Sequence, residues 1–236
     1  MTPVLEISGL HSFYGVSQVL HGLSLTLGAG EQVALLGRNG MGKTTLLKSI
    51  IGLVPERRGA IHVMGQNALH LPPEAIARLG IAYVPEGRGI FGSLSVLENL
   101  KMSARPGRAG RSQWTIDRVF AIFPRLAERR RHGGQQLSGG EQQMLSIGRA
   151  LMTNPALILL DEATEGLAPL VVRDIWNSLA MMRAEGIATI IVDKDHRNLS
   201  RVADRMVMLA KGAIAFSGTP AALAARPDIL ERHLGV

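Results

Sequence analysis

The chain has 236 residues, enough for one large domain or two small ones, and 46% of them are apolar, which can fill a substantial core. It has no cysteine, no run near the roughly 20 apolar residues of a membrane-spanning helix and no secretory signal at its start, so we expect a cytosolic protein without disulfides. The formal net charge of +7 is compatible with nucleic acid or an anionic surface as a partner, so its position along the chain matters more than its sum.

The first predicted elements are strands, followed by a glycine-rich loop and a helix. Leucines alternate with Ser24 and Thr26 over residues 23–27, the period of a half-buried strand, and a glycine turn follows. A second strand is predicted at residues 32–36. After a glycine-rich stretch, residues 44–51 carry leucine and isoleucine at helical spacing without a breaker, which predicts a buried helix.

Three later apolar runs, at residues 81–84, 157–160 and 189–192, are short and bounded by polar or turn residues. This pattern is typical of central strands buried on both faces, so we expect a covered, largely parallel sheet. Residues 94–153 instead have helical periodicity and predict a helical insertion in an α/β core, while residues 105–111, with Pro and Gly, predict a flexible loop.

The excess positive charge lies in one segment, between Lys101 and His132. This segment holds nine lysine or arginine residues against two acidic ones, and the rest of the chain is balanced. A solvated helical face, an anionic membrane surface or acidic partner, and nucleic acid would each explain it. Few aromatic residues accompany these cations, so we expect no nucleic-acid partner.

The glycine-rich stretch has the phosphate-loop pattern of glycine, four residues and then Gly-Lys-Thr. It reads Gly37, Arg38, Asn39, Gly40, Met41, Gly42, Lys43, Thr44 and Thr45. Such glycines let backbone N–H groups turn toward a β-phosphate at a helix N-terminus, Lys43 can reach the β- and γ-phosphates, and Thr44 can bind Mg²⁺. The alternative is a glycine-rich turn with an ordinary lysine, but the pattern and its place between strand and helix agree. We expect the chain to bind ATP.

Two carboxylates, Asp161 and Glu162, follow the predicted strand at residues 157–160. The C-terminal ends of such strands are where ligands bind in α/β sheets. Asp161 suits Mg²⁺ coordination through water, and Glu162 can polarise an attacking water, because γ-phosphoryl transfer needs an oriented nucleophile and neutralised charge. The alternative is an acidic pair that merely begins a loop.

A third motif, Leu137, Ser138, Gly139, Gly140 and Glu141, opens a predicted helix. Ser138 and Glu141 have the spacing of a capping box, which by itself would explain both residues. Capping does not explain two adjacent glycines, which leave bare N–H groups at the positive end of a helix. We therefore expect a second anion site here.

These three motifs, in this order and with these separations, resemble the ATP-binding cassette (ABC) ATPases over essentially the full chain. The resemblance implies an α/β fold with a P-loop NTPase (RecA-like) core at about residues 1–85 and 156–236, an N-terminal antiparallel β portion and a helical subdomain inserted at about 86–155. It also implies that Ser138, Gly139 and Gly140 contact the γ-phosphate of ATP held by a second copy, in a head-to-tail dimer.

Three further stretches are similar to the ATPase subunits of bacterial branched-chain amino acid importers. They are Pro-Glu-Gly-Arg at 85–88, Ser-Gly-Gly-Glu-Gln-Gln-Met at 138–144 and Gly-Leu-Ala-Pro at 166–169. Tyr14 matches the family's aromatic residue that stacks on adenine, the alternative being a surface aromatic. Glu86 fills the position where most cassettes have a metal-contacting glutamine; it can approach Mg²⁺ through water, and this loop usually reports nucleotide state to the membrane subunits.

The chain departs from the family at the switch histidine that contacts the γ-phosphate after the last core strand. Counting from residue 192 places Lys194 at this position and His196 two residues later, where we expect a surface residue at a helix start. Lys194 can contact the γ-phosphate as a point charge but cannot share a proton with Glu162 as neutral imidazole can. Residues 163–165, Ala-Thr-Glu, also depart from the subgroup's Pro-Ser-Leu.

The resemblance implies an ATP-hydrolysing motor subunit of a bacterial ABC importer, for branched-chain or other hydrophobic amino acids, with urea or short amides as the second choice. The implied partners are a second ABC ATPase subunit in a homo- or heterodimer, integral membrane permease subunits and, indirectly, a solute-binding protein, at the cytoplasmic face of the inner membrane. The alternatives are a soluble cassette acting on ribosomes or DNA, and a non-hydrolysing module motivated by Lys194.

Overall fold

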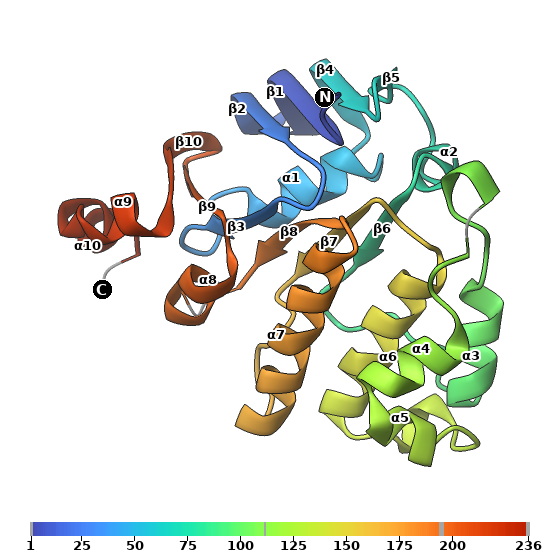
Figure 1. The fold of residues 1–236 in the computed structure, drawn as a ribbon. Helices are drawn as coiled ribbons and strands as arrows, with labels where there is room; N and C mark the ends of the chain where they lie inside the picture. Colours follow the sequence, from blue (N-terminus) through green and yellow to red (C-terminus); the bar gives the residue numbers. More distant parts are fainter. Residues whose placement is uncertain (1, 111, 194–195, 235–236) are drawn as a thin grey trace.

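The computed structural model describes residues 2–110, 112–193 and 196–234, arranged as two sheets and a set of helices (Figure 1). The strands are β1 (Leu5–Tyr14), β2 (Ser17–Leu27), β3 (Gln32–Leu36), β4 (Glu56–Val63), β5 (Gln66–Asn67), β6 (Ile81–Val84), β7 (Leu157–Asp161), β8 (Ala188–Val192), β9 (Arg205–Ala210) and β10 (Ala213–Gly218). The helices are α1 (Lys43–Ile50), α2 (Pro73–Arg78), α3 (Val96–Ser103), α4 (Ile116–Ile122), α5 (Pro124–Glu128), α6 (Gly139–Met152), α7 (Pro169–Ala184), α8 (His196–Val202), α9 (Pro220–Ala224) and α10 (Pro227–Leu234).

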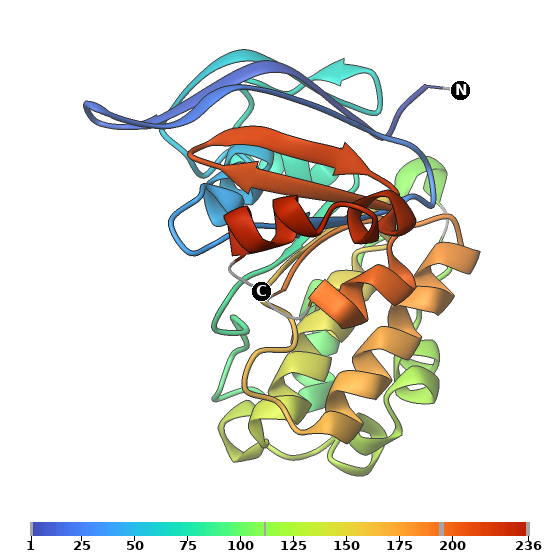
Figure 2. The ribbon, with the colours of Figure 1, turned by 90° about the vertical axis from the view of Figure 1, so that its left-hand side faces the viewer.

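The two sheets differ in strand direction. The smaller one has the order β2-β1-β4-β5 and is antiparallel. The larger one has the order β10-β9-β3-β8-β7-β6, and all its neighbouring strands are parallel except the C-terminal pair β9 and β10. Figure 2 shows the smaller sheet above, the hairpin of β9 and β10 beneath it, and the longer helices below. The expected α/β fold with an antiparallel N-terminal portion is confirmed.

Each central strand contributes to two hydrophobic cores because its side chains alternate between the faces of the sheet. In β3, Val33 and Leu35 join α1 and the smaller sheet, while Ala34 and Leu36 pack against the helices on the opposite face. β7 and β8 alternate in the same way and are buried at every residue. This double burial explains why these strands are continuous apolar runs in the sequence.

The predicted elements agree best for the buried strands. The expected ranges 32–36 and 81–84 coincide with β3 and β6, and β7 and β8 are each one residue longer than predicted. The prediction at 23–27 covers only the end of β2, and the other strands of the smaller sheet were not predicted. β1 has several register shifts against β2, so its pattern of polar and apolar residues is not a simple alternation.

The basic segment is not one uniform face. Arg118 pairs with Glu185 at 2.5 Å and lies over the Trp114 ring at 4.6 Å. Arg129 lies 3.8 Å from Glu141. The exposed cations that remain include Lys101, Arg125, Arg130 and Arg131. Part of the excess positive charge therefore forms ion pairs and a ring contact within the chain.

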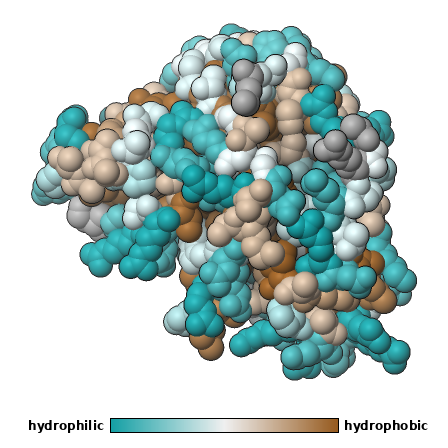
Figure 3. Space-filling view, viewed as in Figure 1, coloured by the Kyte–Doolittle hydropathy of each residue, from teal (hydrophilic) through white to brown (hydrophobic). Residues whose placement is uncertain are grey.

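The surface has no large apolar patch in the view of Figure 3, where hydrophilic side chains dominate and apolar ones are scattered. Within the part of the chain that the structure describes, no helix combines the length and apolar character needed to span a membrane. The predicted loop at residues 105–111 contains a short 3-10 helix, Arg108–Gly110, and the backbone N–H of Arg105 donates to Met152 O at 3.1 Å.

Candidate functional site

The loop at residues 37–45 joins β3 to α1 and has a backbone that requires glycine. Gly37 has φ +145°, and a side chain there would place its Cβ 2.6 Å from the carbonyl oxygen of Leu209. Gly42 begins α1 with φ +99° and offers no side-chain cap, so the first N–H groups of the helix have no capping side chain. Such a helix start is suited to bind an anion.

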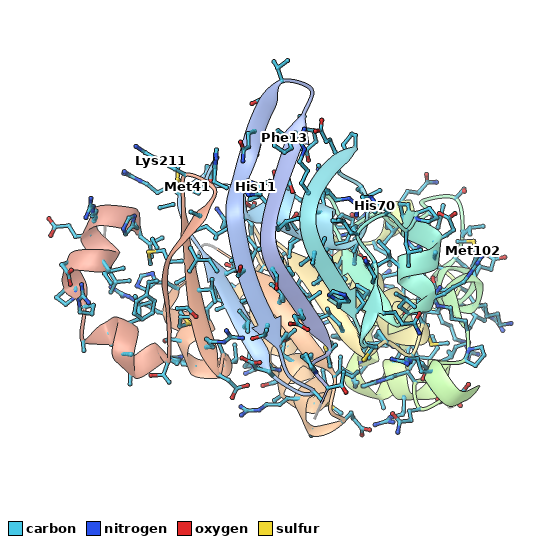
Figure 4. All side chains as sticks on the ribbon, turned by 90° about the horizontal axis from the view of Figure 1, so that it is seen from above. His11, Phe13, Met41, His70, Met102 and Lys211 are labelled. Carbon is cyan, nitrogen blue, oxygen red and sulfur yellow. The ribbon has the colours of Figure 1, made fainter. Side chains whose placement is uncertain are left out.

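The loop is held from the side by the turn between β9 and β10. The N–H of Lys211 donates to Met41 Sδ at 3.2 Å, and the N–H of Gly212 donates to Met41 O, also at 3.2 Å. Figure 4 shows Met41 and Lys211 next to each other at the edge of the molecule. Sequence reasoning missed this support, because residues far apart in the chain provide it.

Lys43 folds back over the loop that precedes it. Its side chain is only 8% exposed, and Nζ donates to Gly37 O at 2.7 Å and to Arg38 O at 3.0 Å. These carbonyl groups hold the ammonium group at the mouth of the loop. A phosphate bound to the loop would therefore meet a fixed positive charge.

Asp161 is fully buried at the end of β7, where two hydroxyl groups contact its carboxylate. Thr44 Oγ1 donates to Oδ1 at 3.1 Å, and Tyr83 Oη donates to Oδ2 at 3.0 Å. Burial raises the pKa of Asp161 above its usual value, and the two hydrogen bonds oppose this shift. The pKa of Tyr83 is raised as well, first by burial and then by the charge of Asp161. Tyr83 is not predicted from the sequence, where its one signal is a hydroxyl group in an otherwise apolar strand.

Glu162 has a backbone conformation that is rare for its residue type. Its φ is +51°, in the left-handed region, and its N–H donates to Val192 O at 2.9 Å at the end of β8. A non-glycine residue in this region costs on the order of 1–2 kcal/mol and persists when its surroundings determine it. This turn directs the chain away from the sheet directly after Asp161.

A cavity of about 510 Å³ lies against the loop and the ends of the central strands. It is lined by Val19, Asn39, Gly40, Gly42, Lys43, Thr44, Thr45, Glu86, Glu162 and Glu165. The structure thus brings Glu86 and Glu162 to one cavity with the glycine-rich loop, and their roles stay predictions. Tyr14 ends β1, is 42% exposed and is not among the lining residues. Lys194 lies outside the described residues, and His196 begins α8.

Thr44, which lines this cavity, and the buried Asp161 to which it is bonded offer oxygen atoms suited to Mg²⁺. The Thr44 hydroxyl and the Asp161 carboxylate are adjacent, and hard oxygen ligands are those that Mg²⁺ prefers. Among the described residues, no group of three or more His, Cys, Asp or Glu side chains could hold a metal ion. The residues present therefore fit an ion that takes its other ligands from nucleotide phosphates and water.

Residues 137–141 lie at the start of α6 and not at this cavity. The capping box is present: the N–H of Ser138 donates to Glu141 Oε2 at 2.8 Å, and the N–H of Glu141 donates to Ser138 Oγ at 3.3 Å. At each of the two glycines, a side chain would also be too close to a neighbouring residue. A Cβ at Gly139 would lie 2.8 Å from Arg88 Nη2, and one at Gly140 would lie 2.8 Å from the methyl groups of Val171. Close packing is therefore a second explanation for these two glycines, and the anion site stays a prediction.

The loop that follows Glu162 is tied to the end of β8. Thr164 donates to Asp193 Oδ2 twice, from its N–H at 3.1 Å and from Oγ1 at 2.5 Å, and both side chains are buried. Sequence reasoning noted Thr164 only as a departure from a subgroup pattern. The bond fixes the segment after Glu162 against the segment that leads to Lys194.

Comparisons with known proteins agree with this arrangement. A family model described as ABC transporter matches residues 20–165. The chain is 40% identical to the high-affinity branched-chain amino acid transport ATP-binding protein BraG of Pseudomonas aeruginosa, over 98% of its own length and 100% of that protein. It is 34% identical to the lipopolysaccharide export system ATP-binding protein LptB of Escherichia coli K12, over 98% of its own length and 97% of that protein.

Solved structures share the fold. An ATP-binding subunit of an ABC transporter is 28% identical and superposes with a TM-score of 0.84, over 98% of this chain and 96% of that one. A dimeric ATP-binding cassette bound to ADP and Pi is 24% identical, with a TM-score of 0.78 over 92% of this chain and 98% of that one. At that identity the second likeness supports the fold alone.

Proposed function

Because this chain belongs to the ABC transporter family and is one of its ATP-hydrolysing subunits, we propose that it drives the uptake of branched-chain or other hydrophobic amino acids by a bacterial importer. The observation that carries the proposal is the 40% identity with BraG over the whole length of both chains. The similarity to LptB makes lipopolysaccharide export the second candidate for the transported cargo. Urea or short amides are a third class.

The geometry of the cavity supports specific roles for its residues. The backbone of residues 37–45 and Lys43 would bind the β- and γ-phosphates of ATP, and Tyr14 would stack on adenine. Thr44 and Asp161 would hold Mg²⁺, which supplies charge neutralisation on the phosphates, and Glu86 would approach it through water. Glu162 would orient and polarise the attacking water, and its fixed left-handed backbone supports that role.

We also propose that a second ABC ATPase subunit completes the site. Residues 137–141 line no part of the cavity that their own chain forms around the phosphate loop, and the N–H groups of Gly139 and Gly140, in the first turn of α6, are available for a nucleotide on another chain. In a head-to-tail pair, the segment of each chain would contact the γ-phosphate held by the other. The helical region at about residues 86–155 would act as a subdomain that carries this segment.

A second groove supports docking of a membrane permease. It has a volume of about 360 Å³, and its lining includes Arg88, Arg105 and Arg149. Burial lowers the pKa of both Arg105 and Arg149, and none of the three forms an ion pair within the described part of the chain. Three partly desolvated guanidinium groups fit a partner segment that carries carboxylates.

The groove adjoins the loop that carries Glu86, since Pro85 and Gly89 also line it. Phe91 is 45% exposed nearby, and the guanidinium of Arg149 lies 4.6 Å from the centre of its ring. A permease bound here would touch the loop that lines the nucleotide cavity. The chain would then be held peripherally at the cytoplasmic face of the inner membrane.

Reconstitution of the chain with its permease subunits and solute-binding protein in proteoliposomes tests the proposal. ATP-dependent uptake of labelled leucine, isoleucine or valine is expected, and Glu162→Gln should abolish it while ATP binding remains. Urea, acetamide and lipopolysaccharide are the competing cargoes in the same vesicles. Transport of any of these without amino acid uptake would overturn the assignment of cargo.

A further inference from the structure

The loop that lines the nucleotide cavity at Glu86 is hydrogen-bonded to the first turn of α6 through Arg88. Arg88 Nη1 donates to Gln142 Oε1 at 2.8 Å. Gln142 in turn donates from Nε2 to Gly134 O at 3.1 Å, in the turn that precedes the helix. One side chain thus connects the edge of the cavity to the segment that carries residues 138–140.

Arg88 makes this contact from a backbone conformation that is unfavourable for arginine. Gly87, Arg88 and Gly89 all have positive φ, of +83°, +70° and +59°. The two glycines adopt such angles readily, but an arginine does not. An unfavourable conformation of this kind persists where the surrounding contacts determine it, and it is found where a side chain must be aimed.

The opposite side of the contact is shaped to receive the guanidinium. Gly139 lies so close to Arg88 that an added Cβ would meet Nη1, Nη2 and Cζ within 3.3 Å. Any larger residue at 139 would displace either the arginine or the start of α6. The glycine that offers a bare N–H to a phosphate is therefore also the glycine that admits Arg88.

We propose that Arg88 is a positioning residue that transmits the state of the nucleotide cavity to residues 138–140. When a bound nucleotide moves the loop that carries Glu86, the bond from Arg88 to Gln142 moves the start of α6 with it. The segment that completes the ATP site of a second copy is then placed only when the first cavity is filled. This inference rests on the proposed pairing of two subunits and names the residue that would regulate it.

The first test measures the response within one chain. Hydrogen exchange of the amides at residues 138–142 is followed with and without Mg-ATP in the Glu162→Gln background, which retains nucleotide. Protection of these amides should change on ATP binding, and Arg88→Gly should remove that change while residues 37–45 stay protected. Gly is chosen because it keeps the positive φ of the loop and deletes only the side chain.

The second test measures pairing. ATP-dependent dimerisation in the Glu162→Gln background should weaken about tenfold with Arg88→Gly, the loss expected for one hydrogen bond to a charged group. Gln142→Leu should weaken it at least as much, because it also removes the bond to Gly134 O. The double variant should be no worse than Gln142→Leu alone. Arg130→Gly, which removes an exposed arginine, is the matched control for charge and should change nothing.

The outcomes separate the two proposals. Loss of the exchange response in Arg88→Gly without any ATP-dependent dimer in the reference protein would support the role of Arg88 and overturn the proposed pairing. A normal exchange response and normal dimerisation in Arg88→Gly would overturn the role of Arg88 and leave the pairing intact. A fall in Tm together with loss of nucleotide protection at residues 37–45 would show that Arg88 only stabilises the fold, and would also overturn it.

Discussion

Tyr83→Phe should weaken the binding of Mg²⁺ at the nucleotide cavity without changing its shape. The substitution removes one hydroxyl group, which donates to Asp161 Oδ2 at 3.0 Å, and leaves the ring in place. A hydrogen bond to a charged group is worth about 1.5–3 kcal/mol, which corresponds to roughly 10- to 100-fold in an equilibrium constant. The loss applies to the ionised carboxylate, so it raises the affinity of Asp161 for protons, which compete with Mg²⁺.

The effect of Tyr83→Phe on the pH dependence of ATP hydrolysis follows from the same hydrogen bond. Burial raises the pKa of Asp161, and the bond from Tyr83 lowers it, because a donated hydrogen bond stabilises the charged form. Without the hydroxyl group, the pKa of Asp161 rises further, so more of the site is protonated at any pH on the acidic side. The acid limb of the ATPase profile should therefore move to higher pH.

The assay is a Mg²⁺ titration of ATP hydrolysis at several pH values, with Tyr14→Phe as the matched control. The chain has two tyrosines, so this control removes the other phenol hydroxyl and keeps the aromatic face that would stack on adenine. At acidic pH Tyr83→Phe should raise the half-saturating Mg²⁺ concentration by up to about tenfold, and Tyr14→Phe should not. Equal Mg²⁺ dependence and an unmoved acid limb in Tyr83→Phe would refute the assignment of Asp161 as a metal ligand supported by Tyr83.

Three further predictions concern buried groups of the same region. Asp161→Asn should abolish ATP hydrolysis and raise the Tm of the nucleotide-free protein at pH 8, because a carboxyl group whose pKa is raised by burial costs stability once it is ionised. An unchanged or lower Tm in a thermal melt would contradict this. Thr164→Val should lower the Tm by several degrees, since it removes the hydroxyl bonded to the buried carboxylate of Asp193 at a cost of about 1–3 kcal/mol, and Thr164→Ser should restore most of it. Gly37→Ala should lose ATP binding in a nucleotide titration and unfold at lower temperature, because its Cβ would lie 2.6 Å from Leu209 O at φ +145°; wild-type affinity would show that the loop has another conformation.

The sequence alone determined the features that depend on neighbouring residues. The phosphate loop is recognisable because its glycines, Lys43 and Thr44 act within one short segment. The strands β3 and β6 were predicted with the observed bounds because burial on both faces makes them uninterrupted apolar runs. The capping box at Ser138 and Glu141 is likewise local, and both of its hydrogen bonds are present.

Only the tertiary structure decided which distant residues meet. Tyr83 reaches Asp161 because β6 and β7 are neighbours in the sheet, and Thr164 reaches Asp193 because the ends of β7 and β8 are adjacent. The start of α6 shows the difference most clearly. The sequence indicates only that Gly139 leaves a bare N–H group at a helix end. The fold adds that the guanidinium of Arg88 occupies the space that a side chain at position 139 would need. Strand order and helix packing set such contacts, and neither is encoded in the spacing of nearby residues.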